Sequence, residues 1–497
     1  MLTPIDPQRP LMWHPLVEVL SKIISDEVYM VGGAVRDAYL HRPLHDLDLA
    51  TPTDGRPLAR YIANHFGGAY YSLDAERGVG RAIISWDGTP LTIDVAQFRG
   101  ANLLTDLQLR DLTLNAMAVR LAPNPQQILD PLGGISDLAA RRIRECSPDA
   151  LSNDPIRMCR AVRAGAVFGM RIEPTTRQHI KHYAPRLAHV SPERIRDEFF
   201  QILDSPHPSA SIDILQRLGL LEHIIPASQS LLAVQQGPPH QLDVWGHTLL
   251  AVRHLSTILQ LFSSHRDENL VGNLQFGLIA WTLDAFRPQL EAFLSHTWAN
   301  GRSHRALLLL TAFLHDVGKP QTRSVQDDGR VRFLSHQDKG ADIAQTQAVA
   351  LRLSNDEAGR VYDVIRHHMR PHWLHNDKLS SRAIYRFWRD TGPAGVDICL
   401  LALADYLATY GTSLDQKQWI SYLEMEHKLL ESYFVYADTR VNPPPLITGQ
   451  YLLDHFDLQP GPRIGEILEQ LRELQASGEI LSYQDALEWV EQILRPQ

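Results

Sequence analysis

The sequence of 497 residues predicts an α+β protein, with a small mixed α/β domain first and a long helical region after it. Within residues 28–120, short runs rich in β-branched and aromatic residues alternate with a helical stretch. From about residue 136 onward apolar residues recur at helical spacing and strand patterns largely vanish. The chain is longer than one hydrophobic core usually supports, so we expect several consecutive domains.

Composition restricts the classes of partner. A formal net charge of -9 argues against a uniformly basic coat for nucleic acid, but residues 141–200 hold 12 Lys or Arg against 7 Asp or Glu. The three cysteines show no CxxC spacing, which fits a reducing compartment. The start of the chain lacks a signal-peptide pattern, and the apolar run at 306–314 is too short to span a bilayer. We therefore expect a cytoplasmic protein with no membrane partner.

The elements of the first domain follow from local patterns. Residues 27–31 predict a strand, the next two glycines a tight turn, and residues 34–40 a helix. A second strand is expected at 45–50 and a helix at 55–67. Residues 82–98 predict a β-hairpin that turns at Asp87 and Gly88.

The rest of the chain reads as helices. Amphipathic segments are expected at 154–168, 192–203 and 208–224. A second helical block, roughly 245–410, contains most of the histidine clusters, and a helical tail follows the three prolines at 443–445. No clear internal repeat is present.

The first strand and helix suggest where a phosphate would bind. Backbone N–H groups at the helix start after Gly32 and Gly33 would face an anion. Asp46 and Asp48, at i and i+2 of a strand, would project from one face, where Mg²⁺ could separate their charges. In the hairpin, Asp94 would point away from the core and supply a third acid. Together these acids would form a two-metal site for nucleotidyl transfer.

The alternative is that the glycine pair marks an ordinary turn and that the two acids are solvated. That reading is favoured for either motif alone. The combination with Arg36, Asp37 and Asp94 argues against it.

Four motifs in order carry a family resemblance. "GGAVRDAYLHRPLHDLDLA" (32–50), "LRDLTLNAMAV" (109–119), "DPLGGISDL" (130–138) and "NDPIRMCRAVR" (153–163) resemble motifs of the class II tRNA nucleotidyltransferases and related bacterial poly(A) polymerases, in the polymerase β superfamily. The resemblance implies that Gly33 and Arg36 contact the nucleotide and that Asp46 and Asp48 bind metal. It also implies that Arg110, Asp111 and Asn115 hold triphosphate and ribose, with Gly32 in the same turn.

The fourth motif suggests how a base is chosen. Asp154 and Arg157, at i and i+3 of an expected helix, could meet the edge of one base, with the carboxylate accepting and the guanidinium donating. Such a pair would admit C and A and reject U and G. By resemblance these two residues act as a template, supported by Arg160 and Arg163. An ordinary surface ion pair is the alternative for an isolated Asp and Arg.

Three departures from the family pattern matter. Asn153 stands where the fourth motif commonly has Glu, and Leu109 replaces the first of two arginines in the second motif. Only "GANLLTDLQ" separates Arg99 from the second motif, where family members that complete the CCA end carry a longer flexible loop, which is associated with the switch from C to A. This short segment resembles the CC-adding branch, in which a separate A-adding enzyme supplies the last nucleotide.

The basic stretch suggests the acceptor. A tRNA acceptor stem could lie along residues 141–200, bound through its phosphates and shape. Arg194 and Arg196 could belong to this strip. A solvated helical face is the alternative for any single arginine.

A second constellation follows in the chain. His247, the adjacent pair His315 and Asp316, and the distant Asp405 resemble the HD superfamily of metal-dependent phosphohydrolases. They could ligate a divalent ion of unspecified identity. His336, with His367 or His368, could assist a second ion or a phosphate. The alternative is a degenerate HD domain that is kept for structure or tRNA binding.

The resemblance implies four domains: a polymerase-β-type nucleotidyltransferase head with a mixed sheet (1–140), an all-α neck (141–232), an HD domain (233–412) and a helical tail (413–497). We expect a Mg²⁺-dependent transferase that adds the CC of the CCA end to tRNA from CTP, with a further phosphohydrolase activity as an open question. The alternatives are a full CCA-adding enzyme that also uses ATP, a poly(A) polymerase or A-adding enzyme, and an HD phosphohydrolase with a non-catalytic RNA-binding head.

Overall fold

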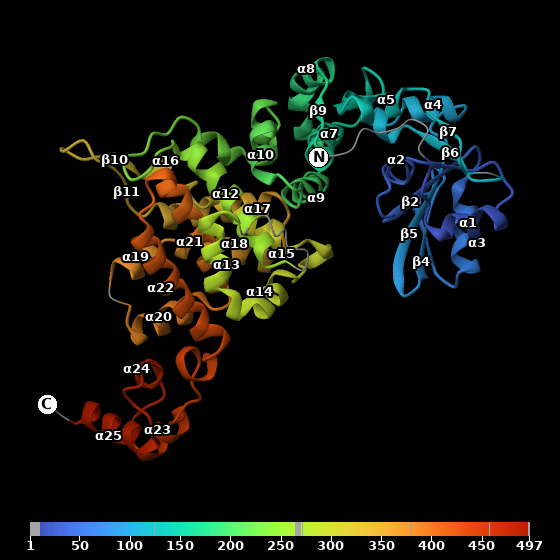
Figure 1. Ribbon diagram of the computed structural model, residues 1–497. Coiled ribbons are helices and arrows are strands. Elements are labelled where there is room, and N and C mark those ends of the chain that lie inside the picture. Colours follow the sequence, from blue (N-terminus) through green and yellow to red (C-terminus); the bar gives the residue numbers. More distant parts are fainter. Residues whose placement is uncertain are drawn as a thin grey trace. The chain divides into compact units, whose positions relative to one another are not determined.

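The computed structural model describes residues 10–123, 125–263, 270, 272–377, 379–456 and 458–495. By internal contacts the chain divides into two compact units, the first formed by Met1–Glu198 with Ile214–His223 and the second by Phe199–Asp213 with Ile224–Gln497. Figure 1 shows the sheet within the first unit and the helices of the second. The predicted α+β class is confirmed.

The first unit is built on a seven-stranded mixed sheet of order β3-β4-β5-β2-β1-β6-β7. Among the described strands of this sheet, β2 and β5 are the pair that runs in parallel, and they bring Asp48 beside Asp94 at the sheet centre. The strands are β1 (Tyr29–Val31), β2 (Asp46–Thr51), β3 (Ala69–Asp74), β4 (Val79–Trp86), β5 (Thr89–Gln97), β6 (Ala118–Arg120) and β7 (Ile128–Leu129).

Alternation along these strands explains their burial. In β5, Leu91, Ile93 and Val95 are buried, whereas Asp94 between them stays partly exposed. The hairpin turns at Asp87 and Gly88 as predicted, and both residues have positive φ (47° and 80°). The helices of this region are α1 (Pro15–Ile23), α2 (Gly33–Leu40), α3 (Gly55–His65), α4 (Leu103–Gln108) and α5 (Gly134–Ala139).

The neck that follows is mainly helical, but it is not all-α. β8 (Arg142–Ile143) and β9 (Arg171–Ile172) form a two-stranded parallel ladder, which is too short to leave an alternating pattern in the sequence. The neck helices are α6 (Ala150–Asn153), α7 (Ile156–Phe168), α8 (Pro174–Tyr183), α9 (Pro192–Leu203), α10 (Pro208–Arg217) and α11 (Leu221–Ile224).

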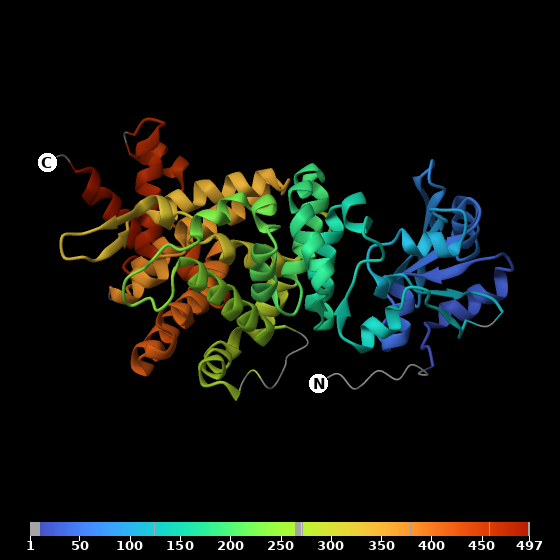
Figure 2. The ribbon, with the colours of Figure 1, turned by 90° about the horizontal axis from the view of Figure 1, so that it is seen from above.

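In the second unit the buried helix α21 (Ala394–Tyr410) packs against α12, α18, α19, α20 and α22. Figure 2 shows the helices of this unit from above. A β10–β11 hairpin (Arg323–Val325 and Val331–Phe333) extends from it. The other helices are α12 (Val244–Leu261), α13 (Leu274–Thr282), α14 (Arg287–Leu294), α15 (His304–Leu314), α16 (Lys319–Thr322), α17 (His336–Ala350), α18 (Asn355–His367), α19 (Arg370–Asn376), α20 (Ser381–Thr391), α21 (Ala394–Tyr410) and α22 (Gln416–Phe434).

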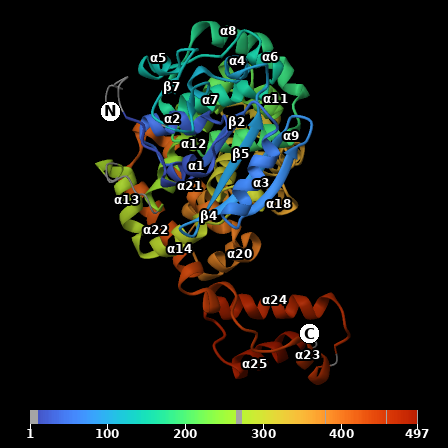
Figure 3. The same ribbon diagram turned by 90° about the vertical axis from the view of Figure 1, so that its right-hand side faces the viewer.

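The tail of the second unit consists of α23 (Gly449–His455), α24 (Pro462–Ser477) and α25 (Tyr483–Leu494), which Figure 3 shows as a small bundle. Its core is built around Leu452, Ile467, Leu471 and Val490. Ion pairs join α24 and the turn after it to α20, with Arg386 on Glu473 (2.6 Å) as an example. The tail is therefore tied to the helix α20.

Among the described residues, the stretch Ala394–Ser413 is long and apolar enough to cross a membrane. Within it, 89% of the most apolar window is buried by other parts of the fold.

The core of the second unit contains an acid that is expected to make stability depend on pH. Burial raises the pKa of Glu426, which is fully buried on α22, from its ordinary 4.5 to about 8, against smaller opposing effects of Cys399 and Tyr422. The folded protein therefore binds more protons than the unfolded chain between pH 4.5 and 8. Stability is fully present below pH 4.5 and falls as pH rises through this window, by roughly 3 kcal/mol at most at pH 7.

The neutral isostere Glu426→Gln should remove this slope. We expect a higher melting temperature than the wild type at pH 7.5 and convergence of the two proteins near pH 5, measured by thermal unfolding across pH. Glu424→Gln, an exposed glutamate on the same helix, is the matched control. Parallel pH profiles for Glu426→Gln and the wild type would contradict the assignment.

Candidate functional site

The turn before α2 is shaped by Gly32. This residue has φ 73° and ψ -139°, a conformation that favours glycine, and it forms the N-cap of α2. A Cβ atom at this position would lie 2.9 Å from Oδ2 of Asp48. Because Gly32 has no side chain, the start of α2 at Gly33 can lie close to the carboxylate of Asp48 on β2.

Asp46 and Asp48 lie at the start of β2, with Asp46 exposed and Asp48 half-buried. Burial raises the pKa of Asp48, and repulsion from Asp94 and Asp46 raises it further, while Arg110 acts in the opposite direction. A divalent cation between the two acids would offset both effects. The donor set, carboxylate oxygens on one strand face beside a helix start, thus suits Mg²⁺ and a nucleotide phosphate.

Asp94 lies beside Asp48 as the sequence predicts, but its carboxylate already has a partner. Arg81 of β4 donates Nε and Nη2 to the two oxygens of Asp94 at 2.7 and 2.8 Å. Sequence reasoning missed Arg81, although counting back from the hairpin turn pairs it with Asp94 directly. The structure therefore presents Asp94 as an ion-paired acid.

This pairing predicts unequal effects of the three acids. Asp94→Asn should lower nucleotide addition by about tenfold or less, because a half-exposed ion pair is lost and no free ligand is removed. The measurement is single-turnover extension of tRNA by Asp94→Asn and Asp48→Asn side by side. Equal losses in the two variants would instead make Asp94 a third metal ligand.

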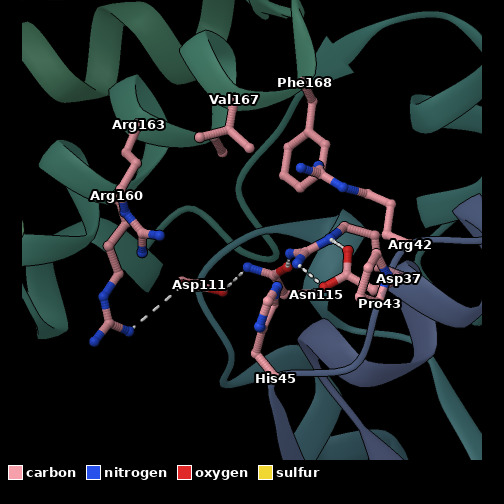
Figure 4. A pocket seen from close by; sticks show the side chains of 12 residues that line it. Asp37, Arg42, Pro43, His45, Asp111, Asn115, Arg160, Arg163, Val167 and Phe168 are labelled. Carbon is pink, nitrogen blue, oxygen red and sulfur yellow. Dashed lines mark hydrogen bonds and ion pairs between the residues drawn. The ribbon is translucent and has the colours of Figure 1, made fainter. Parts of the chain in front are cut away.

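A pocket of about 260 Å³ is lined by residues of α2, the second motif and α7, and Figure 4 shows its lining. Arg36 donates to Asn115 Oδ1 at 2.5 Å and is held by Asp37 at 2.8 Å. Asn115 in turn donates to Asp111 Oδ1 at 3.2 Å. The predicted residues Arg36, Asp111 and Asn115 thus form one hydrogen-bonded chain at the pocket wall.

The arginines of α7 line the opposite side of this pocket (Figure 4). Arg160 lies 3.7 Å from Asp111 and 3.6 Å from Glu198, and Arg163 donates to Glu198 at 2.5 Å. Glu198 is nearly buried and was not singled out from the sequence, where it is one acid among several in a helix. Glu198 holds Arg163 by a hydrogen bond and attracts Arg160 by charge alone.

The expectation that Asp154 lies in a helix with Arg157 is wrong. Asp154 is extended (φ -146°, ψ 94°) and precedes α7, because Pro155 disfavours the helical conformation in the residue before it. Its Oδ2 nevertheless lies 3.8 Å from Nε of Arg157. The two side chains are therefore neighbours, but they make no hydrogen bond with each other.

A second candidate site lies in the second unit. His247 of α12, His315 with Asp316 after α15, and Asp405 of α21 meet in the interior, all at least nine-tenths buried. His247 Nε2 is 2.9 Å from Asp405 Oδ1, and His315 Nε2 is 3.2 Å from Asp316 Oδ2. The predicted set His247, His315, Asp316 and Asp405 is thus brought together from separate helices.

Asp316 is shared by two groups of possible ligands. One group is His247, His315 and Asp316, and the other is Asp316, His336 and His368, each with its ligand atoms within 4.8 Å of one another. His336 Nε2 lies 3.5 Å from Asp316 Oδ1 and 3.3 Å from His368 Nε2. Of the two adjacent histidines considered, His368 is the one in the site.

The histidines are oriented as metal ligands need. His315, His336 and His368 each place Nδ1 within 2.6–2.8 Å of a backbone carbonyl oxygen. Since a carbonyl can only accept, each Nδ1 carries a proton, which leaves Nε2 as the nitrogen that can bind a metal once it is unprotonated. Among the described residues, Nε2 of His247 and Nε2 of His315 have no hydrogen bond of acceptable geometry, and Oδ2 of Asp316 has an ion-pair contact with Lys319 but no such hydrogen bond. Imidazole nitrogens and a carboxylate oxygen in this arrangement are suitable ligands for a divalent cation.

The carboxylates of this site favour a positive charge between them. Burial would lower the pKa of His315, but Asp316 and Asp405 raise it to about 10, so a proton occupies this imidazole when no cation is bound, and a divalent ion would replace that proton. Burial, with His336 and His315, lowers the pKa of His368 to about 3, which keeps it neutral. A neutral imidazole is the form that binds metals.

A pocket of about 440 Å³ opens beside these residues. Lys319 and His372, which sequence reasoning missed, are among its lining residues. Lys319 Nζ is 2.7 Å from Asp316, and His372 Nε2 is 2.9 Å from Asp405. Tyr406 and Tyr410 contribute aromatic surface. The signal for Lys319 was present in "HDVGKP", where it follows Asp316 by one helical turn.

Three segments of the chain match known protein families. Residues 28–144 match the poly A polymerase head domain, residues 169–232 the probable RNA and SrmB-binding site of polymerase A, and residues 290–410 the HD domain.

Individual proteins resemble nearly the whole chain. An A-adding tRNA nucleotidyltransferase of Deinococcus radiodurans is 32% identical over 93% of this chain and 94% of its own length. A CC-adding tRNA nucleotidyltransferase of Geobacter sulfurreducens is 29% identical over 92% and 90%. The Thermotoga maritima CCA-adding enzyme, solved with tRNA, shares the fold with a TM-score of 0.60 at 21% identity, covering 99% of this chain and 97% of that one. The names of the first two divide between A addition and CC addition.

Proposed function

Because this chain belongs to the tRNA nucleotidyltransferase family, we propose that it adds cytidines to the 3′ end of tRNA from CTP and releases pyrophosphate. On this proposal it builds the CC of the CCA end and stops before the terminal A. The observation that carries the choice is the short, folded segment between β5 and Arg110.

Hydrogen bonds fix the conformation of this segment along its length. Asn102 caps α4 by accepting from the N–H of Thr105 at 3.0 Å. Asp106, only 2% exposed, accepts from the N–H of Arg99 and from Nε of Arg110, both at 3.0 Å. A flexible loop that reshapes the nucleotide pocket between C and A has no counterpart among these residues. The segment instead fixes Arg110 beside the turn at Gly32.

The chemistry is the displacement of pyrophosphate by the tRNA 3′-hydroxyl. Its oxygen bonds to the α-phosphorus of CTP, the bond from that phosphorus to the bridging oxygen breaks, and the hydroxyl proton passes to solvent. Asp46 and Asp48 would hold Mg²⁺, which neutralises charge on the attacking oxygen and the leaving pyrophosphate. The protein's own contribution is to orient the hydroxyl and the triphosphate in line.

We assign the remaining head residues by their positions. The turn at Gly32 and Gly33 with Arg110 would cradle the triphosphate, and Asp111 with Asn115 would bind the ribose. Asp154 and Arg157 would read the base, with Arg160 and Arg163 supporting it. Basic residues between 141 and 200 other than those at the base and Arg194 would bind the phosphates of a tRNA acceptor stem in the cytoplasm.

The test is extension of tRNA transcripts that end at the discriminator base, C or CC, resolved to single nucleotides with Mg²⁺ and CTP, ATP or both. Growth by two residues with CTP, and none on the CC-ended transcript with ATP, would support CC addition and require a separate A-adding enzyme. Addition of A to the CC-ended transcript would overturn CC-only addition and leave full CCA addition or A addition, according to the use of CTP.

Two further outcomes of the same assay would point to different activities. Repeated addition of A to varied RNAs would indicate a poly(A) polymerase. No extension of any RNA, together with phosphate ester hydrolysis, would indicate an HD phosphohydrolase whose head only binds RNA.

A second candidate function rests on the buried site in which two groups of possible metal ligands share Asp316. We propose that this site binds one or two divalent ions and hydrolyses phosphate monoesters or 2′,3′-cyclic phosphates. Lys319, Arg332 and His240 at the pocket supply cationic or donor groups for a phosphate. Hydrolysis of these esters by the intact protein, with metal added back after chelation, is the corresponding assay.

A further inference from the structure

Base selection by Asp154 and Arg157 raises a physical difficulty. An acid and an arginine three residues apart attract each other, and a closed ion pair would use up the groups that the base must meet. In this structure their nearest atoms, Oδ2 and Nε, stay 3.8 Å apart. Something must hold the two side chains apart.

Arg157 is held by the backbone. It is 9% exposed, and its Nη1 donates to the carbonyl oxygens of Arg110 at 3.1 Å and Ala150 at 3.0 Å. These carbonyls come from two separate segments of the chain, so the guanidinium is fixed from two sides. These hydrogen bonds therefore keep the guanidinium of Arg157 from moving toward the carboxylate of Asp154.

Asp154 is held from α9. Nη2 of Arg194 donates to both carboxylate oxygens, at 3.0 Å to Oδ1 and 2.9 Å to Oδ2. Asn153, next in the chain, carries no charge and cannot compete for Arg194 as an ion-pair partner. Pro155 on the other side restricts the backbone of Asp154. The carboxylate is thus drawn toward α9.

We infer that Arg194 is the positioning residue of nucleotide selection, which keeps Asp154 away from Arg157 so that both can meet one base edge. This inference rests on the base-reading role proposed above for Asp154 and Arg157. A single nitrogen bridges both oxygens, so Arg194 can retain one oxygen while the other accepts from the exocyclic amino group of cytosine or adenine. Uracil and guanine offer a carbonyl at that point and cannot take up the released oxygen.

Removing Arg194 should therefore weaken selection more than catalysis. In Arg194→Ala, Asp154 closes on Arg157, and we expect the Kd for CTP to rise about tenfold and the preference for CTP over UTP to fall about tenfold. The rate at saturating CTP should change by less than about threefold, because the reacting atoms are untouched. Arg194→Lys keeps the charge but not the planar geometry and should lie between.

The experiment combines calorimetric titration with CTP and UTP, without tRNA, and competition of the two nucleotides in tRNA extension. The variants are Arg194→Ala, Arg194→Lys, Asp154→Ala and the double variant, with melting temperatures recorded for each. Arg77→Ala, which removes another exposed arginine beside an aspartate (Asp74), is the control. If Arg194 acts through Asp154, Arg194→Ala adds nothing to Asp154→Ala.

Two results would overturn the inference, and they differ from failure of the base-reading proposal. Unchanged CTP binding and nucleotide preference in Arg194→Ala, while Asp154→Ala loses both, would show that Asp154 reads the base without Arg194. Fully additive losses in the double variant would show that Arg194 acts elsewhere, as on RNA. Unchanged nucleotide preference in Asp154→Ala would instead reject base reading itself.

Discussion

Asp46→Asn and Asp48→Asn are each expected to abolish nucleotide addition, with a loss on the order of 10³-fold or more in the single-turnover rate. Each change removes a negative oxygen ligand from the start of β2 while keeping the shape of the side chain. Asp48→Asn should also remove a charge that burial and repulsion by Asp94 and Asp46 disfavour, so the fold should be at least as stable as the wild type. The measurement is extension of a CC-less tRNA with saturating CTP.

Glu76→Gln is the matched control, because Glu76 is an exposed acid in the turn between β3 and β4 of the same sheet. Melting curves should show folded protein in all three variants. A variant at Asp46 or Asp48 that extends tRNA at a rate within tenfold of the wild type would remove the head acids from the reaction.

The acids of the head could be found from the sequence because their placement depends on strand alternation. Two acids at i and i+2 share a strand face in almost any sheet, and Gly32 marks the turn that brings α2 close. Arg81, the partner of Asp94, was not predicted, because an arginine is not a metal ligand and the pattern of acids does not point to it. The pairing of Arg81 with Asp94 was available from the hairpin register, which the turn at Asp87 and Gly88 determines.

The conformation of Asp154 shows a different limit. The periodic apolar pattern predicts that α7 begins at residue 154. In the structure the helix begins at Ile156, because Pro155 keeps the residue before it out of the helical conformation. The contact from Arg194, forty residues later, depends on how α9 packs and leaves no local pattern. For the same reason, the order of histidines indicated the second site, but the sharing of Asp316 between two groups required the packing of four helices.

Because both groups of ligands share Asp316, a change of this residue is expected to have the second large effect, on metal binding. Asp316→Asn should lower the affinity for divalent metal on the order of 100-fold or more, since it weakens both groups at once. Bound metal, measured by mass spectrometry after dialysis, should fall to a small fraction of the wild-type content. Hydrolysis of p-nitrophenyl phosphate or of a 2′,3′-cyclic nucleotide should be lost with it, whereas tRNA extension should be retained, because the head acids are unchanged.

A comparison of single variants separates one ion from two. His368→Ala touches only the group with His336, so it should remove about half of the metal if two ions bind and little if one ion binds at His247 and His315. His455→Asn, an exposed histidine in the tail, controls for incidental binding by imidazole. Wild-type protein without stoichiometric metal, or Asp316→Asn with undiminished content, would leave the buried cluster a structural one. Loss of tRNA extension in folded Asp316→Asn would show that the two chemistries depend on each other.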